Sequence, residues 1–198
     1  MKPITVAITG TMGSGKSSFN KALCELGFKT MSADRIVGAL CQKGQRGYLG
    51  LLQLNIEYLT DKDSNIDKNF LRELVFSDDK IRKKVEAILH PLVIEEIKLE
   101  IATLKEGEKF SVEIPLLFEI GLDKLCDYNV VVHRDQNEVF KSVSDKYNPD
   151  KFNTKKLLEL QMSSGQKMIK ADYIIMNDGD LETLKQKAKM FCDIIDAK

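Results

Sequence analysis

The chain has 198 residues, enough for one domain with a substantial core or for one domain that carries an insertion. Thirty basic and thirty acidic residues give a formal net charge of zero, so composition offers no electrostatic case for nucleic acid or an acidic membrane. The four cysteines are scattered without a C-x-x-C pair, which predicts reduced thiols in a cytoplasmic protein and argues against a zinc site or disulfide framework.

The first predicted strand leads into the most informative motif of the chain. Residues 4–9 form a short, β-branched and apolar run that predicts a buried strand. Residues 10–17 read GTMGSGKS and match the phosphate-binding pattern G-x-x-x-x-G-K-[ST] in full. Residues 17–26 then carry apolar positions at helical spacing and stop at Gly27. Strand, loop and helix in this order favour a nucleotide-binding loop over a glycine-rich turn with a chance lysine.

A loop of this kind binds phosphate with its backbone N–H groups and with the positive end of the helix that follows. Lys16 is therefore predicted to reach the β and γ phosphates of ATP, and the Ser17 hydroxyl to bind Mg²⁺. The predicted ATP-binding residues of this segment are Gly10, Met12, Gly13, Ser14, Gly15, Lys16, Ser17 and Ser18.

Further strands and helices alternate along the rest of the chain. Short apolar runs predict strands at residues 28–31, 110–114, 129–132 and 173–176. A helical tract is predicted from about 34 to 104, interrupted at 43–47 and at His90-Pro91, and a last amphipathic helix from about 181 to 195. This alternation predicts an α/β fold with a doubly wound, five-stranded parallel sheet. Ligands of such sheets bind beyond the carboxyl ends of the strands.

Two carboxylates stand at those ends. Asp34 follows the second strand. It could be a base that accepts a proton from an attacking hydroxyl or the N-cap of the next helix, and its position fits both roles equally. Glu113 lies at the end of the third strand, where it would orient a hydroxyl, hold Mg²⁺ through water, or simply pair with a lysine. The residues alone leave these alternatives open.

Residues 135–171 are rich in lysine and are the candidate for a mobile cationic lid. Small phosphotransferases need such a cover to exclude water and to neutralise charge on the transferring phosphoryl group. The alternative is a solvated helical hairpin whose lysines only increase solubility. The lysines of this segment are Lys141, Lys146, Lys151, Lys155, Lys156, Lys167 and Lys170.

Taken in order, these motifs resemble the dephospho-coenzyme A kinase family over nearly the whole chain. The matching blocks are residues 9–17, Ala33-Asp34, residues 88–92 (ILHPL), residues 114–119 (IPLLFE), Gln161, Lys167, Ala171-Asp172 and residues 177–179 (NDG). The resemblance implies a P-loop NTPase/kinase fold. It also implies Mg²⁺-dependent transfer of the γ-phosphate of ATP to the ribose 3′-hydroxyl of dephospho-CoA, the last step of CoA synthesis.

The resemblance further implies one kinase domain with three parts: a core (1–33, 105–134 and 172–198), a helical CoA-binding region (34–104) and a lid (135–171). Asp34 matches the base of the family, and the predicted substrate-binding residues are His90, Glu113 and Leu116. For His90, a structural role before a helix-starting proline is at least as favoured. Asn177 and Gly179 match a loop near the ATP base, although a turn that leaves the last strand explains the same residues.

The chain departs from the family at the strand ends and in the lid. Ser32 and Glu113 stand where the family usually has aspartate, and Ser142, Lys146 and Leu157 fall where it has arginine. Lys146 is the predicted replacement cation, with another lysine of the lid as the alternative, although a lysine lacks the planar fork with which arginine holds phosphate. A related nucleoside or sugar kinase and a non-catalytic nucleotide-binding protein are the alternatives. The oligomeric state does not follow from the sequence.

Overall fold

The computed structural model describes residues 2–135 and 161–197. The chain divides into two compact units. The first consists of Met1–Ser32 together with Ile101–Lys198, and the second of Ala33–Glu100.

The first unit is built on a five-stranded sheet in which every neighbouring pair is parallel. Its strands are β1 (Ile4–Thr9), β2 (Lys29–Ser32), β3 (Lys109–Glu113), β4 (Tyr128–His133) and β5 (Tyr173–Met176). The spatial order is β2-β3-β1-β4-β5. The α/β fold with five parallel strands is thereby confirmed, and each observed boundary lies within one residue of the predicted one.

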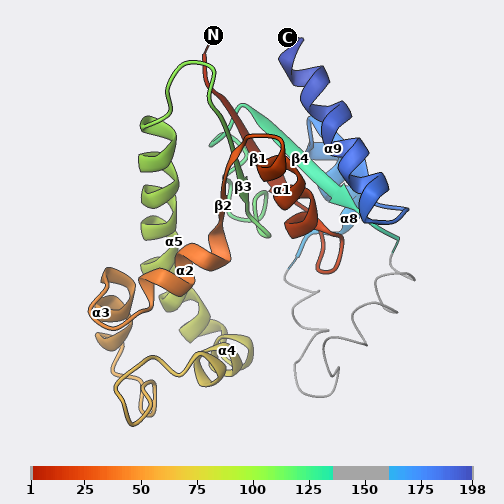
Figure 1. The fold of residues 1–198 in the computed structure, drawn as a ribbon. Coiled ribbons are helices and arrows are strands. Elements are labelled where there is room, and N and C mark those ends of the chain that lie inside the picture. The colour runs from red at the N-terminus through yellow and green to blue at the C-terminus, as the bar shows by residue number, and fades with distance from the viewer. Residues whose placement is uncertain (1, 136–160, 198) are drawn as a thin grey trace. The chain divides into compact units, whose positions relative to one another are not determined.

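Among the described residues, the helices that lie wholly in the first unit are α1 (Lys16–Glu25), α8 (Ser164–Lys170) and α9 (Leu181–Asp196). Helices α1 and α9 pack together against one face of the sheet (Figure 1). Their apolar stripes meet alternate strand residues in a core that includes Val6, Ile8, Phe19, Leu23, Val130, Val132, Ile175 and Phe191. This packing follows from the period of two in strands and of about 3.6 in helices.

The position of β1 in the middle of the sheet creates the crevice that ligands use in such folds. The chain leaves β1 towards β2 on one side, and later crosses from β3 over β1 to β4 on the other side. Loops therefore diverge at the carboxyl end of β1, which is where ligands bind in open parallel sheets. The glycine-rich loop begins at this point.

The second unit contains the helices α2 (Ala33–Leu40), α3 (Arg46–Leu52), α4 (Lys68–Ser77) and most of α5 (Asp79–Ala102). It has an apolar core of its own, formed by Cys41, Tyr48, Leu51, Leu59, Ile66, Val85 and Leu89. The predicted helical character of this region is confirmed, with two corrections.

The predicted interruption at His90-Pro91 is wrong, because α5 runs through both residues. Pro91 is exposed, and its missing N–H removes one helical hydrogen bond. A buried stripe on either side of the proline compensates for that loss, and its members are Val85, Leu89, Val93 and Ile97.

The second correction concerns residues 53–67, which are not helical. Asn55, Tyr58 and Ser64 have φ angles of 51°, 61° and 63°, in the left-handed region that a right-handed helix excludes. In addition, Asp61 Oδ1 accepts hydrogen bonds from the N–H groups of Asp63 and Asn65. Such side-chain bonds to nearby backbone favour turns over helix.

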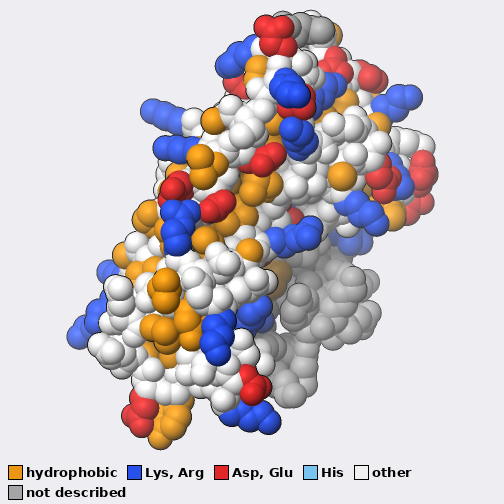
Figure 2. Space-filling view, turned by 60° about the vertical axis from the view of Figure 1, so that its left-hand side comes forward, with side chains coloured by type: hydrophobic (Ala, Val, Ile, Leu, Met, Phe, Trp, Pro, Cys, Tyr) orange, Lys and Arg blue, Asp and Glu red, His pale blue; other side chains and the backbone are white. Residues whose placement is uncertain are grey.

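Charged side chains of both signs are interspersed on the face of the described residues that Figure 2 shows. This pattern agrees with the formal net charge of zero. None of the helices in residues 2–135 and 161–197 combines the length and the apolar character that crossing a membrane requires.

Candidate active site

Two glycines allow the phosphate loop to lie tightly against its neighbours. Gly10 has a φ of 149°, and a Cβ atom added there would lie 2.2 Å from the carbonyl oxygen of Val132. Gly15 has a φ of 97°, and its Cβ would lie 2.2 Å from Nδ2 of Asn177. Any larger residue would clash at either position and would also strain the backbone. The loop is therefore held between β4 and the segment after β5.

The start of α1 is suited to binding an anion. Gly15 is the N-cap residue and provides no side-chain hydrogen bond to the first turn. The first backbone N–H groups of a helix have no partner within the helix, and together with the dipole they attract phosphate. Lys16 is 7 % exposed, and its Nζ donates to the carbonyl oxygen of Thr11 at 2.8 Å. The Lys16 side chain thus folds back over the phosphate loop.

Ser17 and Glu113 meet beside that loop. The Ser17 hydroxyl in the first turn of α1 donates to Oε1 of Glu113 at the end of β3, at 3.0 Å. Glu113 is 8 % exposed. Hydroxyl and carboxylate oxygens are the hard ligands that Mg²⁺ prefers, so this pair fits the ion. Among the described residues, no group of three or more His, Cys, Asp and Glu side chains could hold a metal alone. Phosphate oxygens and water would therefore complete the ligand set.

Asn177 ties the end of β5 to the phosphate loop. Its Nδ2 donates to the carbonyl oxygen of Ser14 at 2.8 Å, and its backbone N–H donates to the carbonyl of His133 at 2.7 Å. Gly179 lies two residues further on, directly before the N-cap Asp180 of α9. The contact with Ser14 goes beyond the simple turn that the sequence left open.

The structural role of Lys167 was not predicted from the sequence. As one of the lysines of segment 135–171 it was predicted to be part of a cationic lid or, alternatively, solvated, and the solvated alternative is wrong because its side chain is fully buried. Its membership of a lid stays a prediction. Its Nζ lies 2.9 Å from Oε1 of Glu119 and donates to the carbonyl oxygen of Pro115 at 2.7 Å. Burial lowers the pKa of Lys167, and the Glu119 carboxylate partly offsets this effect. The available signal was Glu119 itself, a carboxylate within an apolar block.

Asp34 and His90 belong to the second unit, where each lies inside a helix, and a structural role of His90 stays a prediction. Asp34 lies inside the first turn of α2 and is exposed, and its side chain makes no hydrogen bond to the described residues, so the N-cap interpretation is wrong. His90 is half-buried in the middle of α5, so the proline after it does not start a helix. Leu116 is half-buried in the turn after β3. Lys146, Ser142 and Leu157 lie outside the described residues.

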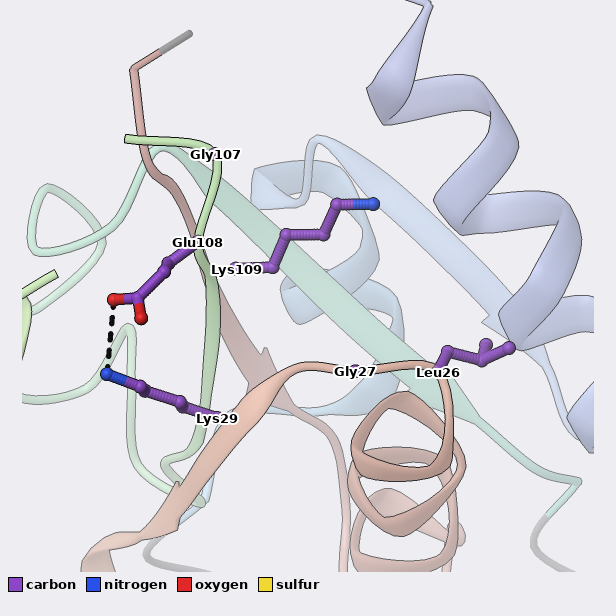
Figure 3. Close-up of a pocket in the computed structure, with 6 residues that line it drawn as sticks. All are labelled: Leu26, Gly27, Lys29, Gly107, Glu108 and Lys109. Atoms are coloured by element: carbon purple, nitrogen blue, oxygen red, sulfur yellow. Dashed lines mark hydrogen bonds and ion pairs between the residues drawn. The ribbon is translucent and has the colours of Figure 1, made fainter. Parts of the chain in front are cut away.

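A pocket of about 280 Å³ lies at the opposite edge of the sheet, at the amino ends of β2 and β3 (Figure 3). Lys29 and Glu108 form an ion pair there at 3.1 Å, whereas Lys109 points away from that pair. Leu26, Gly27 and Gly107 complete the lining. Since ligands of parallel sheets bind at the carboxyl edge, this pocket is separate from the candidate site.

The fold and the site together define the class of the protein. A parallel sheet whose central strand ends in a G-x-x-x-x-G-K-S loop, with a serine and a carboxylate beside it, is characteristic of P-loop kinases.

Comparison with known proteins identifies the family within that class. A family model described as dephospho-CoA kinase matches residues 4–183, and the chain belongs to this family of kinases. The dephospho-CoA kinase of Fusobacterium nucleatum is 32 % identical over 195 residues, which cover 98 % of this chain and 100 % of that protein.

Solved structures agree with this result. The dephospho-CoA kinase from Campylobacter jejuni is similar with a TM-score of 0.71 and 28 % identity, covering 98 % of this chain and 97 % of that one. A protein from Thermus thermophilus is similar with a TM-score of 0.79 and 27 % identity, covering 98 % of both chains.

Proposed function

We propose that this protein transfers the γ-phosphate of ATP to the ribose 3′-hydroxyl of dephospho-CoA and so forms CoA in the last step of its synthesis. Family membership supports the choice of substrates. The observation that carries the chemistry is the hydrogen bond between Ser17 and Glu113 beside the loop that holds Lys16. This arrangement brings a cation, a hydroxyl and a carboxylate to the carboxyl edge of the sheet. The four free thiols support a reducing compartment such as the cytoplasm.

The phosphate loop would bind ATP through its amides and its lysine. The backbone N–H groups at the start of α1 would face the phosphates, and Lys16 would exchange the Thr11 carbonyl for the β and γ phosphates. Asn177 would stabilise the loop through its hydrogen bond to the carbonyl oxygen of Ser14. The proposed ATP-binding residues are Gly10, Met12, Gly13, Ser14, Gly15, Lys16, Ser17, Ser18, Asn177 and Gly179.

Ser17 would bind Mg²⁺ directly, and Glu113 would hold it through water. When bound, the ion neutralises negative charge that develops as the phosphoryl group is transferred. The protein contributes by keeping the two oxygens together before the ion arrives, since the Ser17–Glu113 hydrogen bond already joins helix and strand. Such preorganisation lowers the cost of binding.

Asp34 would act as the base. Its carboxylate would accept the proton of the 3′-hydroxyl, whose oxygen forms a bond to the γ phosphorus while the bond to the β,γ-bridging oxygen breaks and ADP leaves. The support is that Asp34 is an exposed carboxylate two residues beyond Ser32, the register partner of Glu113. His90 and Leu116 are proposed as substrate contacts, and Lys146, on sequence grounds, as a cation for the transferring group.

The decisive experiment is to incubate the purified protein with MgCl₂, ATP and dephospho-CoA and to quantify CoA and ADP. We expect the two products in equal amounts. Phosphorylation of a nucleoside or sugar without formation of CoA would show a related kinase. ATP binding without any turnover would show a non-catalytic nucleotide-binding protein.

The role of Asp34 is tested by Asp34→Asn. The amide keeps the size of the side chain but cannot accept the proton, so kcat should fall by roughly 10²–10⁴-fold while ATP affinity stays nearly unchanged. Asp79→Asn is the matched control, because Asp79 is also an exposed carboxylate in the first turn of a helix of the same region. Turnover near the wild-type rate in Asp34→Asn would show that another group accepts the proton.

A further inference from the structure

Lys167 carries a buried charge that the proposed reaction does not use. Its side chain is fully buried at the carboxyl edge of the sheet, one of the most costly positions for an ammonium group. Three partners surround Nζ: the carbonyl oxygen of Pro115 at 2.7 Å, Oε1 of Glu119 at 2.9 Å and Oγ1 of Thr9 at 3.4 Å. An ammonium group has three N–H donors. All three are directed at protein atoms, so this lysine is not placed to hold phosphate.

The partners of Lys167 connect two segments that lead to the proposed Mg²⁺ ligands. Thr9 is the last residue of β1 and immediately precedes the phosphate loop. Its hydroxyl donates to the carbonyl of Pro115 at 3.1 Å, so threonine and lysine share one acceptor. Pro115 lies two residues beyond Glu113, the partner of Ser17. The ammonium group therefore fixes the end of β1 relative to the segment that carries Glu113.

Glu119 extends this arrangement to the residues before α8. Its side chain is 13 % exposed, and Oε1 accepts a hydrogen bond from the backbone N–H of Met162 at 2.7 Å as well as the contact with Lys167. Helix α8 begins at a capping box formed by Ser163 and Gln166, which sets the direction from which Lys167 enters. One ion pair thus joins β1, the turn after β3 and α8.

We propose that Lys167 is a positioning residue for phosphoryl transfer, which together with Glu119 keeps Ser17 and Glu113 in the arrangement that binds Mg²⁺. A well-packed apolar pair is often as stable as a buried ion pair, so stability by itself does not require these charges. Backbone pairing sets the register of β1 and β3 as far as Ile8 and Glu113. Directional bonds to Thr9 and Pro115 extend this link beyond the last register pair, which an apolar pair cannot do. The inference rests on the proposed role of Ser17 and Glu113 in binding Mg²⁺.

The test separates stability from positioning with variants of the full chain. Lys167→Met alone leaves the largely buried Glu119 carboxylate without its countercharge and is expected to unfold easily. The double variant Lys167→Met with Glu119→Leu removes both charges and should recover stability. Thr9→Val removes the shared hydroxyl, keeps the shape of the side chain and leaves no unpaired charge. For each, turnover per folded molecule is measured against Mg²⁺ concentration, and binding of Mg²⁺-free ATP is measured separately.

In the double variant, the Mg²⁺ concentration for half-maximal turnover should rise roughly tenfold or more, as it does when residues that orient metal ligands are lost. Thr9→Val should shift it in the same direction by a smaller factor. Binding of Mg²⁺-free ATP should change little. The control is Lys185→Met with Glu25→Leu, which removes a surface ion pair of 2.7 Å between α1 and α9 and should shift nothing.

A normal Mg²⁺ requirement in both the double variant and Thr9→Val would overturn the positioning role and leave Lys167 a purely structural residue. Glu113→Gln distinguishes this result from a failure of the proposed site. If Glu113→Gln leaves the Mg²⁺ requirement unchanged, the proposed role of Glu113 is wrong. If only Glu113→Gln shifts it, that role holds and the inference about Lys167 fails.

Discussion

The two edges of the sheet carry similar ion pairs in different surroundings. At the carboxyl edge, Lys167 and Glu119 lie 2.9 Å apart with side chains 0 % and 13 % exposed. At the amino edge, Lys29 and Glu108 lie 3.1 Å apart, but their side chains are 46 % and 31 % exposed. Distance alone would rank the two pairs as equals. Burial separates them, because water screens an exposed pair and leaves a buried pair to be satisfied by protein atoms alone.

The pKa values follow the same division. Burial lowers the pKa of Lys167 against the opposing effect of Glu119. The pKa of Glu108 is lowered by hydrogen bonds from the Lys105 N–H and from Lys29, in contact with water. The carboxyl edge therefore holds charged groups in fixed places, which a catalytic site requires, whereas the charges of the amino edge are free to exchange partners with solvent.

The largest expected effect is that of Lys16→Ala at the carboxyl edge. The substitution removes the charge that bridges the β and γ phosphates, so CoA formation should be abolished. The measurement is turnover with saturating MgATP and dephospho-CoA. Lys21→Ala, an exposed lysine on the same helix, should keep wild-type activity. A Lys16→Ala variant that retained more than roughly a tenth of the wild-type rate would contradict the assignment of the loop.

The next effect compares the two ion pairs directly. Lys167→Met should lower the free energy of unfolding by about 3–5 kcal/mol, because it leaves the buried Glu119 carboxylate without its partner. Lys29→Met should leave the urea midpoint unchanged, since its partner Glu108 is exposed to water. Urea denaturation of both variants under the same conditions gives the comparison. Equal losses would show that burial is not what separates the two edges.

The smallest effect is a pH dependence at the amino edge. The Asp127 carboxylate accepts hydrogen bonds from the N–H and the hydroxyl of Thr5, at 2.9 and 2.7 Å, and from Lys2. Burial raises the pKa of Asp127, but these bonds outweigh it and lower the pKa from 3.8. The folded protein therefore binds a proton at Asp127 less readily than the unfolded chain does. The contribution of Asp127 to stability is fully present above pH 3.8 and is lost as the pH falls through the lowered pKa of the folded state.

In the Asp127→Asn variant, the free energy of unfolding should therefore decrease less on acidification than in the wild type. The free energy of unfolding of the wild type is followed by urea denaturation from neutral pH to below pH 3.8, the ordinary pKa of the group. The variant should be less stable near neutral pH, and the difference from wild type should narrow as the pH falls. If the free energies of unfolding of the two proteins fell in parallel with pH, Asp127 would not contribute to the loss of stability in acid.

Local patterns were sufficient for the parts of the fold and site that depend on neighbouring residues. The apolar runs predicted all five strands, because short runs of β-branched and apolar residues favour the extended backbone whichever faces they bury. Gly10 and Gly15 marked the phosphate loop, since their φ angles and close contacts exclude side chains there. Residues 53–67 were missed because turn-forming side-chain bonds, such as those to Asp61, outweigh helix propensity.

The sequence by itself thus determined the elements, the loop and the residues that follow each strand. The tertiary structure decided the strand order, the meeting of Ser17 with Glu113 and of Asn177 with Ser14, and the burial of Lys167. Tertiary packing also keeps α5 continuous at Pro91, because residues on both sides of the proline are buried. The physical reason is that local propensity acts between near neighbours along the chain. Burial and long-range hydrogen bonds join segments more than a hundred residues apart, such as Thr9 and Lys167.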